Sequence, residues 1–523
     1  MVASKSKHSL SRRQVLRVIV TGASSSLVPA SLFVPSISSA TPLFDDGLAR
    51  SSPDKVGIDP RSILNFIDSA FAMDLGLHSF MLYRHGNVVA EGWSWPYLNH
   101  RPHMMHSLTK SVTACGVGMA LDEGYFSLHD KVVSFFDEEL PAAVSSKLES
   151  MTIRDLLTMQ SGHAESVSGS VFRQVKTSWV AEFFKIPVVY DPGSHFLYSS
   201  ALSFMLSAII TKTTGERLRD FLEPRLFGPL GISKLTWGSS PNGINSGGNG
   251  LSWTTADSLK LGILHLRMGD WDGRQVIPRS WIDEATRSQV LETSYDGEQY
   301  GYHWWQNDSS NAYFAEGAFG QFSIVFPECD AVLALTAGVQ DESLIDLVWK
   351  YFPAAFGDST LQRNEVANDE LRDRTENLRL LPEPYYTTSP LARRISGRIY
   401  VIEPNEDNVS KVKLTFSDGK LVFSLSDERG NHRVNVGMRD WIEGNTSITG
   451  NKLHHQYQSD DMRVVANGRW WDEHTLEMTW QFVETAWVDT VVCRFYDDRI
   501  SIDRRVNANY APRVRPTLRG RSM

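Results

Sequence analysis

Residues 107–121 read SLTKSVTACGVGMAL, and the interpretation of the whole chain begins from them. The stretch is apolar almost all round and rich in small residues, which is typical of a helix buried on every side. Ser107 and Lys110 are three residues apart at its start, so a helix places both side chains on one face within about 6 Å. We therefore expect the central helix of a domain, with a serine and a lysine at its N-terminus.

This Ser107–Lys110 pair suits nucleophilic catalysis. A serine hydroxyl is a weak nucleophile until a neighbouring base takes its proton, and lysine is such a base only when burial or nearby positive charge lowers its pKa. A buried helix N-terminus supplies both influences and leaves the Ser107 N–H free to polarise a carbonyl. Three other copies of Ser-x-x-Lys begin at Ser4, Ser52 and Ser417, but none opens an apolar helix. A capping serine beside an ordinary lysine is the alternative.

Hydrophobic periodicity predicts an α+β fold class for this part of the chain. Strand-like segments come first and last with mostly helical ones between them, which differs from the regular alternation of a doubly wound sheet. We expect helices at 61–73, 107–121, 152–160, 199–213, 216–227, 257–268, 278–288 and 343–356. We expect strands at 79–84, 87–93, 301–306, 312–317, 321–327 and 331–337. The first and last strands are expected to share one sheet.

The length of 523 residues predicts more than one folded unit, because a single core rarely grows so large. We place the first domain at 41–360 and a polar linker at 361–380. From 381 to 513 the pattern changes to a period of two, as in VKLTF at 412–416. This predicts a small antiparallel β barrel or sandwich that folds as a separate domain. Residues 514–523 are expected to be a tail.

Residues 1–40 resemble a cleavable export signal. Arg12 and Arg13 precede a modest apolar stretch, and small residues follow at 38–40. Ser11-Arg12-Arg13 with Leu16 is similar to a twin-arginine signal. The apolar stretch is too interrupted for a stable membrane span. We expect an exported protein, periplasmic or secreted; a disordered basic tail is the alternative.

Charge and composition argue against several other classes of function. The net charge is −9 and no basic block is present, so nucleic acid is not an expected partner. Three cysteines supply no disulfide framework. His103, His106 and His163 lack ligand spacing, and His454-His455 gives no zinc pattern. We therefore expect no metal and no cofactor.

Beyond the first motif, the chain resembles the family of serine β-lactamases, D,D-peptidases and family VIII carboxylesterases. The motifs that carry the resemblance, in the family's order and spacing, are Ser107-Leu108-Thr109-Lys110, Tyr198-Ser199-Ser200, and Ala315-Glu316-Gly317-Ala318 followed by Gly320-Gln321. Flanking segments that agree with it are 152–163, Pro192-Gly193, and 247–251 with Asp257. The resemblance covers roughly residues 50 to 356. It implies a β-lactamase-like fold, an antiparallel sheet flanked by helices with an all-helical region.

The same resemblance implies roles for the motif residues. Ser107 would be the nucleophile, with Lys110 and Tyr198 as the groups that activate it. The N–H groups of Ser107 and Ala318 would form the oxyanion hole. Which of Lys110 and Tyr198 takes the proton during acylation stays open, and so does a structural role for Tyr198.

Two positions depart from the β-lactam-processing members of the family. Ser200 replaces their usual Asn, and Ala315 replaces a Lys or His that would hold a substrate carboxylate. Strand alternation aims Ala315 and Gly317 at the site and Glu316 away from it, toward a structural ion pair. Ser200, Ala315, Gly317 and Trp305 are the substrate-binding candidates.

These departures make the chain most similar to the 6-aminohexanoate-dimer hydrolase and esterase branch of the family. We expect a serine hydrolase that cleaves a small-molecule carboxylic ester or linear amide through an acyl-Ser107 intermediate. The alternatives are a β-lactamase or peptidoglycan D,D-peptidase, and a catalytically silent protein that binds an acyl ligand. The natural substrate and the oligomeric state stay open.

Overall fold

The structure is a computed structural model that describes residues 45–167, 169–293, 298–307, 309–448, 451–455, 457 and 461–523. The predicted export signal lies outside these residues. Among the helices that the structure describes, none has the length and apolar character needed to cross a membrane.

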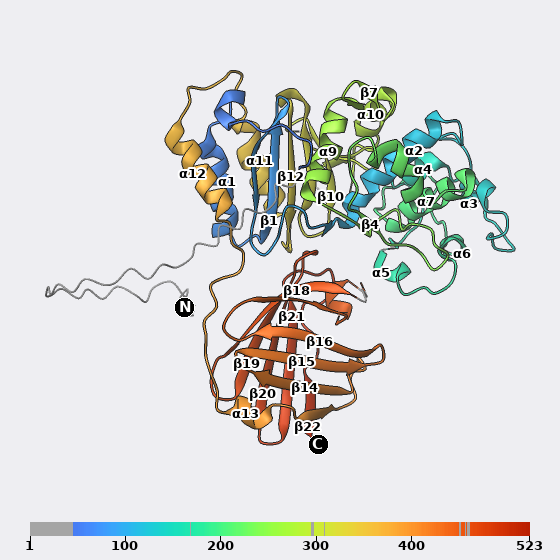
Figure 1. Cartoon of the computed structure of the whole chain (residues 1–523). Coiled ribbons are helices and arrows are strands. Elements are labelled where there is room, and N and C mark those ends of the chain that lie inside the picture. Colours follow the sequence, from blue (N-terminus) through green and yellow to red (C-terminus); the bar gives the residue numbers. More distant parts are fainter. Residues whose placement is uncertain are drawn as a thin grey trace, which may run out of the picture. The chain divides into compact units, whose positions relative to one another are not determined.

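A seven-stranded antiparallel sheet organises the N-terminal region, in the order β2-β1-β12-β11-β10-β9-β8 (Figure 1). Its strands are β1 (Leu77–Arg84), β2 (Asn87–Trp93), β8 (Glu298–Tyr300), β9 (Trp305–Asn307), β10 (Ala312–Gly317), β11 (Gln321–Phe326) and β12 (Ala331–Ala337). Strand β1 pairs with β12, so that Phe80 lies opposite Leu335. The expectation that the first and last strands share a sheet is therefore confirmed.

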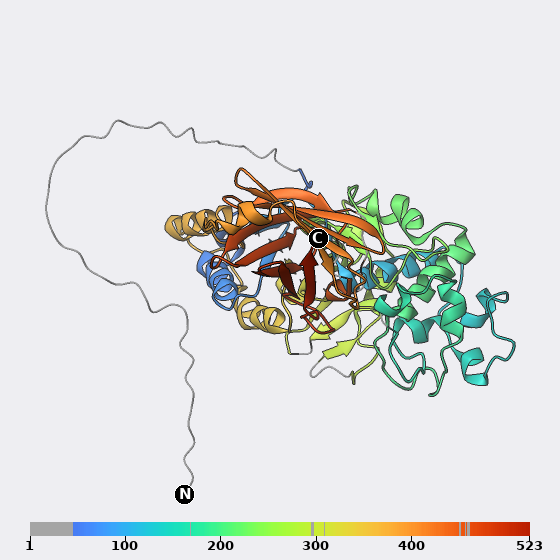
Figure 2. The same cartoon turned by 90° about the horizontal axis from the view of Figure 1, so that it is seen from below.

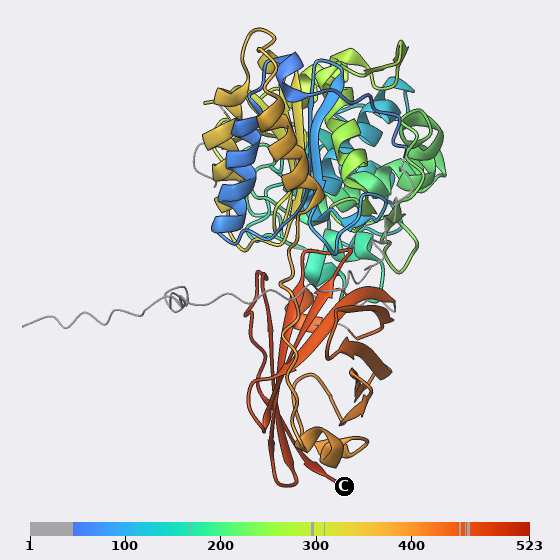
Figure 3. The ribbon, with the colours of Figure 1, turned by 60° about the vertical axis from the view of Figure 1, so that its left-hand side comes forward.

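Helices cover both faces of this sheet. Helices α1 (Pro60–Ala72) and α11 (Ser343–Ala355) lie on one face, and α9 (Thr255–Leu266) packs on β11 and β12 from the other (Figure 3). Helix α1 begins where the Asp59 side chain accepts a hydrogen bond from the Arg61 N–H, with Pro60 in the first turn. Because helices cover both faces of the sheet, every residue of β1 and β12 is buried.

An all-helical region lies beside the sheet, shown in cyan to green in Figure 2. Its elements are α2 (Thr109–Asp122), α3 (Ser146–Ser150), α4 (Ile153–Leu157), α5 (Gly169–Phe172), α6 (Trp179–Phe184), α7 (Ser200–Thr214), α8 (Leu218–Leu222) and the π-helical turn η4 (Glu223–Phe227). Helix α2 contacts α7 and α8, and all its residues from Thr109 to Ala120 are buried. This confirms the expected central helix, which is preceded by a 3-10 turn, η2 (His106–Leu108).

The strand expected at 301–306 is wrong in its bounds, because the chain turns sharply inside that range. Strand β8 ends at Tyr300, and β9 begins only at Trp305. Gly301 lies so close to helix α10 (Arg279–Thr286) that a Cβ there would be 2.2 Å from the Ala285 carbonyl oxygen. His303 also has a φ of 62°, which no strand permits.

Part of the segment interpreted as a linker forms a helix, α12 (Glu365–Glu376). The Asn364 side chain caps it by accepting a hydrogen bond from the Ala367 N–H. Ala367 and Leu371, four residues apart, are its buried apolar side chains, and the helix packs on α1 and β2. So narrow an apolar face gives little periodicity, which is why the sequence pattern did not reveal the helix.

The C-terminal region is a β barrel, one of the two architectures expected from its period of two. A ten-stranded sheet runs in the order β16-β15-β14-β13-β22-β21-β20-β19-β18-β17, and a bridge from Gly437 in β16 to Asn467 in β18 closes nine of the strands. The strands are β13 (Ile399–Ile402), β14 (Lys411–Ser417), β15 (Lys420–Asp427), β16 (Gly430–Gly437), β17 (Ile442–Thr446), β18 (Met462–Trp470), β19 (Thr475–Phe482), β20 (Val488–Tyr496), β21 (Arg499–Val506) and β22 (Leu518–Ser522). The division of the chain into separately folding domains stays a prediction.

The last ten residues are not a free tail, because they contain strand β22. This strand pairs with β13 on one side and with β21 on the other. Leu518 is buried in the barrel core, and a Cβ at Gly520 would lie 2.8 Å from the Val401 carbonyl oxygen. A five-residue strand with a single large apolar residue shows no alternation of apolar and polar side chains, so the sequence pattern did not predict it.

The close packing of helix α2 yields a stability prediction. A Cβ at Gly118 would lie 2.3 to 2.4 Å from three indole atoms of Trp281, whereas at Gly116 its nearest neighbour would be a Leu218 methyl carbon at 2.7 Å. Overpacking costs about 1 to 3 kcal/mol, and a flexible leucine yields more easily than an indole. We expect Gly118→Ala to lower the free energy of unfolding by more than the matched Gly116→Ala, as measured by urea denaturation. Equal losses would contradict this account of the helix.

Candidate functional site

Ser107 lies in the η2 turn, directly before helix α2. A small sheet fixes this turn, because β3 (His103–Met104) pairs with β5 (Leu251–Trp253), which also pairs with β4 (Thr236–Trp237). The Met105 N–H then donates to the Leu251 carbonyl at 2.9 Å. His106 has a φ of 47°, a left-handed conformation that is rare for a residue with a side chain. The Ser107 side chain is thereby left partly exposed at a fixed position.

Lys110 lies under Ser107, and only 1% of its surface is exposed. Its ammonium group donates to the Ser107 hydroxyl at 3.0 Å, to the Ser200 hydroxyl at 3.2 Å and to the Gly248 carbonyl at 2.8 Å. Three acceptors account for the three N–H bonds of an ammonium group. The sequence prediction that Ser107 and Lys110 meet on one helix face is confirmed by this geometry.

Burial lowers the pKa of Lys110 from 10.5 to about 7, while the negative charge of Glu316 acts to raise it. A base is most effective when its pKa is close to the working pH. An uncharged Lys110 amine, 3.0 Å from the Ser107 hydroxyl, is thus placed to accept its proton.

Tyr198 lies beside the same ammonium group, which is 4.7 Å from the centre of its ring. The ring is stacked on Trp305, with the two ring centres 5.5 Å apart, and Trp305 in turn packs edge-on against Tyr300. Trp305 is 4% exposed. It therefore holds Tyr198 in place more than it offers a surface to a substrate.

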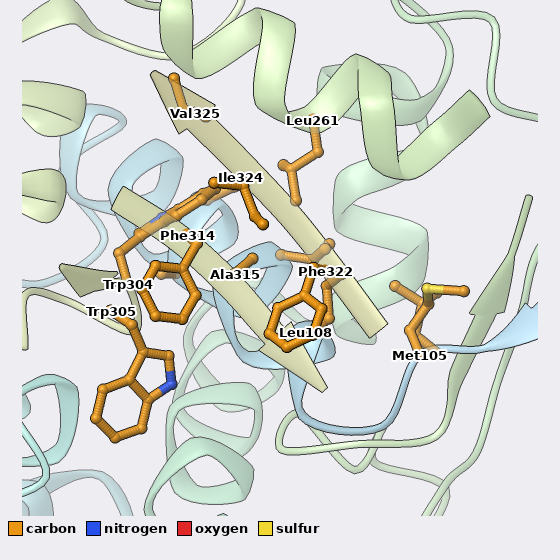
Figure 4. Packing of buried hydrophobic residues seen from close by; sticks show 14 of the residues in the cluster. Met105, Leu108, Leu261, Trp304, Trp305, Phe314, Ala315, Phe322, Ile324 and Val325 are labelled. Carbon is orange, nitrogen blue, oxygen red and sulfur yellow. The ribbon is translucent and has the colours of Figure 1, made fainter. Parts of the chain in front are cut away.

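Strand β10 approaches the nucleophile turn through Gly317. A Cβ at this position would lie 2.0 Å from the Met105 carbonyl oxygen, so only glycine allows the approach. Ala318 follows directly in the sequence, and its place in an oxyanion hole stays a prediction. Ala315 is fully buried on β10 among Leu108, Phe314 and Phe322 (Figure 4). A fully buried side chain has no surface with which to contact a substrate, so the substrate-binding role expected of Ala315 stays a prediction.

Glu316 follows Ala315 on strand β10, where alternation predicts that its side chain points to the opposite face of the sheet. Burial and the nearby charge of Glu342 raise the pKa of its carboxyl group to about 7. The expected ion pair is not found, because within the described part of the chain no lysine, arginine or histidine lies within salt-bridge distance of Glu316. Glu316 instead acts on Lys110 from a distance, because its negative charge raises the pKa of the lysine.

The Gly247–Gly250 segment lies at the site and supplies a group that the sequence did not indicate. The Gly248 carbonyl is the closest acceptor for Lys110. A Cβ at Gly247 would lie 2.3 Å from the Ser203 carbonyl oxygen, and one at Gly248 would lie 2.7 Å from that of Ser200. The glycines thus let a backbone carbonyl reach the lysine, a role that leaves no side-chain signature.

The histidines near the motifs have structural surroundings. His103 bonds to His78 at 3.1 Å, and His163 bonds to the Ser161 hydroxyl at 2.7 Å. The His106 ring packs edge-on against Phe319. Among the described residues, no cluster of histidine, cysteine and carboxylate side chains could hold a metal ion.

Comparison with known proteins supports the relationship that the motifs indicate. Residues 77–344, just over half of the chain, match the family described as Beta-lactamase. The chain is 22% identical over 282 residues to 6-aminohexanoate-dimer hydrolase of Paenarthrobacter ureafaciens, a match that covers 49% of this chain and 71% of that protein.

Two further similarities are more limited. An uncharacterized protein of Mycobacterium tuberculosis is 29% identical over 148 residues, which is 24% of this chain and only 37% of that protein. A solved Bacillus anthracis structure, provisionally named a 6-aminohexanoate-dimer hydrolase, superposes with a TM-score of 0.50 at 18% identity, covering 58% of this chain and 86% of the other. At that identity the likeness shows the fold alone.

The pKa of Lys110 leads to a prediction for the pH dependence of ester cleavage. Proton transfer from Ser107 needs the neutral amine, so kcat/KM should rise as the pH increases through about 7. The Glu316 carboxylate stabilises the charged lysine and raises its pKa. We expect Glu316→Gln to move this rise to lower pH, as measured by pH profiles of kcat/KM.

The exposed Glu328, which accepts a hydrogen bond from Asn311, provides the control for charge removal. Glu328→Gln should leave the profile in place. A Glu316→Gln profile shifted to higher pH, or not shifted, would show that the two groups are not coupled in this way.

Proposed function

The chain belongs to the β-lactamase family, and from that membership we propose that it hydrolyses a carboxylic ester or a small linear amide through an acyl-Ser107 intermediate. The observation that carries this proposal is the 3.0 Å contact between the Ser107 hydroxyl and a buried lysine whose pKa is about 7. Serine hydrolases need this combination of an accessible hydroxyl and a base that is neutral near physiological pH.

In the proposed reaction, the Ser107 oxygen attacks the substrate carbonyl carbon while its proton passes to the Lys110 and Tyr198 pair. The N–H groups of Ser107 and Ala318 stabilise the oxyanion that develops. The tetrahedral intermediate then collapses, the bond to the alcohol or amine breaks, and the same pair returns the proton to the leaving group. Water then attacks the acyl-enzyme while the Lys110 and Tyr198 pair takes its proton. The pair returns that proton to the Ser107 oxygen, and the acid is released.

The lack of charge at Ala315 favours an ester or linear amide over a β-lactam. Family members that process β-lactams usually carry a cation at this position, where this chain has a buried methyl group. The relative from Paenarthrobacter ureafaciens is named a 6-aminohexanoate-dimer hydrolase, which is consistent with the same preference. A β-lactamase or D,D-peptidase would need its carboxylate-binding charge from elsewhere.

Covalent labelling tests the nucleophile. A fluorophosphonate should add one adduct per chain, detected by intact mass, and Ser107→Ala should abolish it because the Ser107 hydroxyl, 3.0 Å from the buried lysine, is the group proposed to attack. The matched control is Ser417→Ala, since Ser417 begins another Ser-x-x-Lys pattern, at the turn between β14 and β15. Labelling of Ser107→Ala at the wild-type rate would overturn the assignment, and no labelling of wild type would favour the silent binding protein.

Substrate preference tests the reaction class. A charge-assisted hydrogen bond is worth roughly 1.5 to 3 kcal/mol, so lacking one should cost about tenfold to a hundredfold in efficiency on carboxylate-bearing β-lactams. We expect wild type to have a far higher kcat/KM on p-nitrophenyl butyrate than on nitrocefin. Ala315→Lys should raise the nitrocefin-to-ester ratio, and Ala315→Met, similar in length but uncharged, should not. Equal wild-type efficiency on the two substrates would instead support a β-lactamase.

A further inference from the structure

The described residues that contact Arg173, which follows helix α5, all present neutral groups to it. Its Nη1 donates to the Asn249 side-chain oxygen at 3.4 Å, and its Nη2 donates to the His455 carbonyl at 2.5 Å. Its guanidinium carbon lies 3.7 Å from the centre of the Tyr457 ring. Within the described residues it has no carboxylate partner, and its buried Nε has no hydrogen-bond acceptor.

Such neutral surroundings are unusual for a partly buried cation, since a charge that loses contact with water normally has a counter-ion. Arg504 and Arg515, which are also largely buried, both pair with Asp407 in the barrel. Burial lowers the pKa of Arg173, and the only opposing influences come from Tyr457. The guanidinium therefore has unused capacity to bind an anion, and none of the described residues supplies a carboxylate to it.

Arg173 is close to the catalytic residues of the proposed function. Asn249, its hydrogen-bond partner, directly follows Gly248, whose carbonyl accepts from Lys110. The positive charge of Arg173 also contributes to lowering the pKa of His106, the residue before Ser107. Asn249 and His106 thus connect Arg173 to the residues around Ser107.

The barrel holds the groups that position Arg173. The turn η6 (Asn451–His454) is fixed by a buried 2.7 Å contact between His454 and Asp489, and the His454 ring is stacked on Trp487 at 4.8 Å. His455 and Tyr457 come directly after this turn. The barrel thus presents a carbonyl and an aromatic face to an arginine of the N-terminal region.

We propose that Arg173, positioned by the barrel residues His455 and Tyr457, binds a carboxylate at the far end of a linear ester or amide substrate. This inference rests on the proposed function and adds a substrate class to it, monoesters or monoamides of dicarboxylic acids and similar anionic acyl compounds. It is compatible with poor β-lactam turnover, because Ala315 lies on β10 while Arg173 lies on the side of the Gly247–Gly250 segment. A flexible acyl chain can reach the side of the Gly247–Gly250 segment. In a β-lactam, the rigid fused rings instead hold the carboxylate close to the reacting carbonyl.

The test compares two esters that differ in one group, mono-p-nitrophenyl adipate and p-nitrophenyl hexanoate, in which a methyl replaces the carboxylate. We expect Arg173→Gln to lower the adipate-to-hexanoate ratio of kcat/KM by about tenfold to a hundredfold. Arg173→Lys should lower the adipate-to-hexanoate ratio by less than Arg173→Gln does. Arg217→Gln removes an exposed arginine paired with Asp220 and serves as the matched control, with an unchanged ratio.

A binding measurement separates this inference from the proposed function. Adipate is titrated calorimetrically into wild type and Arg173→Gln, and we expect it to bind wild type at least tenfold more tightly. If neither ester is hydrolysed, the proposed function fails while the calorimetry still decides the role of Arg173. An adipate-to-hexanoate ratio or an adipate affinity that is the same in Arg173→Gln and wild type would overturn the inference.

Discussion

The burial of the Lys110 ammonium group is the constraint on which the arrangement of the site depends. A lysine excluded from water must have all its donors satisfied or give up its charge. Here the acceptors come from the turn before α2, the first residue of α7 and a backbone carbonyl between them in space. The glycines at 247 and 248 follow from this requirement, because each permits a close approach that a larger side chain would prevent.

His106 shows how the nucleophile turn depends on the barrel. Its backbone is held in the left-handed region, which is costly for a residue with a Cβ unless its surroundings fix it. Its ring packs edge-on against Phe319 of the N-terminal region and against Tyr457 and Trp487 of the barrel. The strained residue before Ser107 is therefore enclosed by aromatic side chains that are distant in the sequence.

The features of the structure that were predicted are the ones encoded locally. The spacing of Ser107 and Lys110, the apolar run of α2 and the alternation in the barrel strands are each visible within about fifteen residues. The features that were missed depend on distant partners. Helix α12 has only Ala367 and Leu371 to indicate a buried face, the Gly248 carbonyl has no side chain, and the contact of Arg173 with His455 joins residues 282 positions apart. The absent ion pair of Glu316 is of the same kind, since strand alternation gives the direction of a side chain and not its neighbours.

The position of strand β22 in the barrel determines the order in which the two regions can be completed during synthesis. The sheet of the N-terminal region has all its strands once β12 has been made, because β1 pairs with β12. The barrel, by contrast, places β22 between β13 and β21, its first strand and one of its last. Until residues 518–522 emerge from the ribosome, β13 and β21 both have an open edge, a state in which strands pair readily with other chains. Barrel closure therefore has to wait for β22, whereas the sheet of the N-terminal region can be completed as soon as β12 has been made.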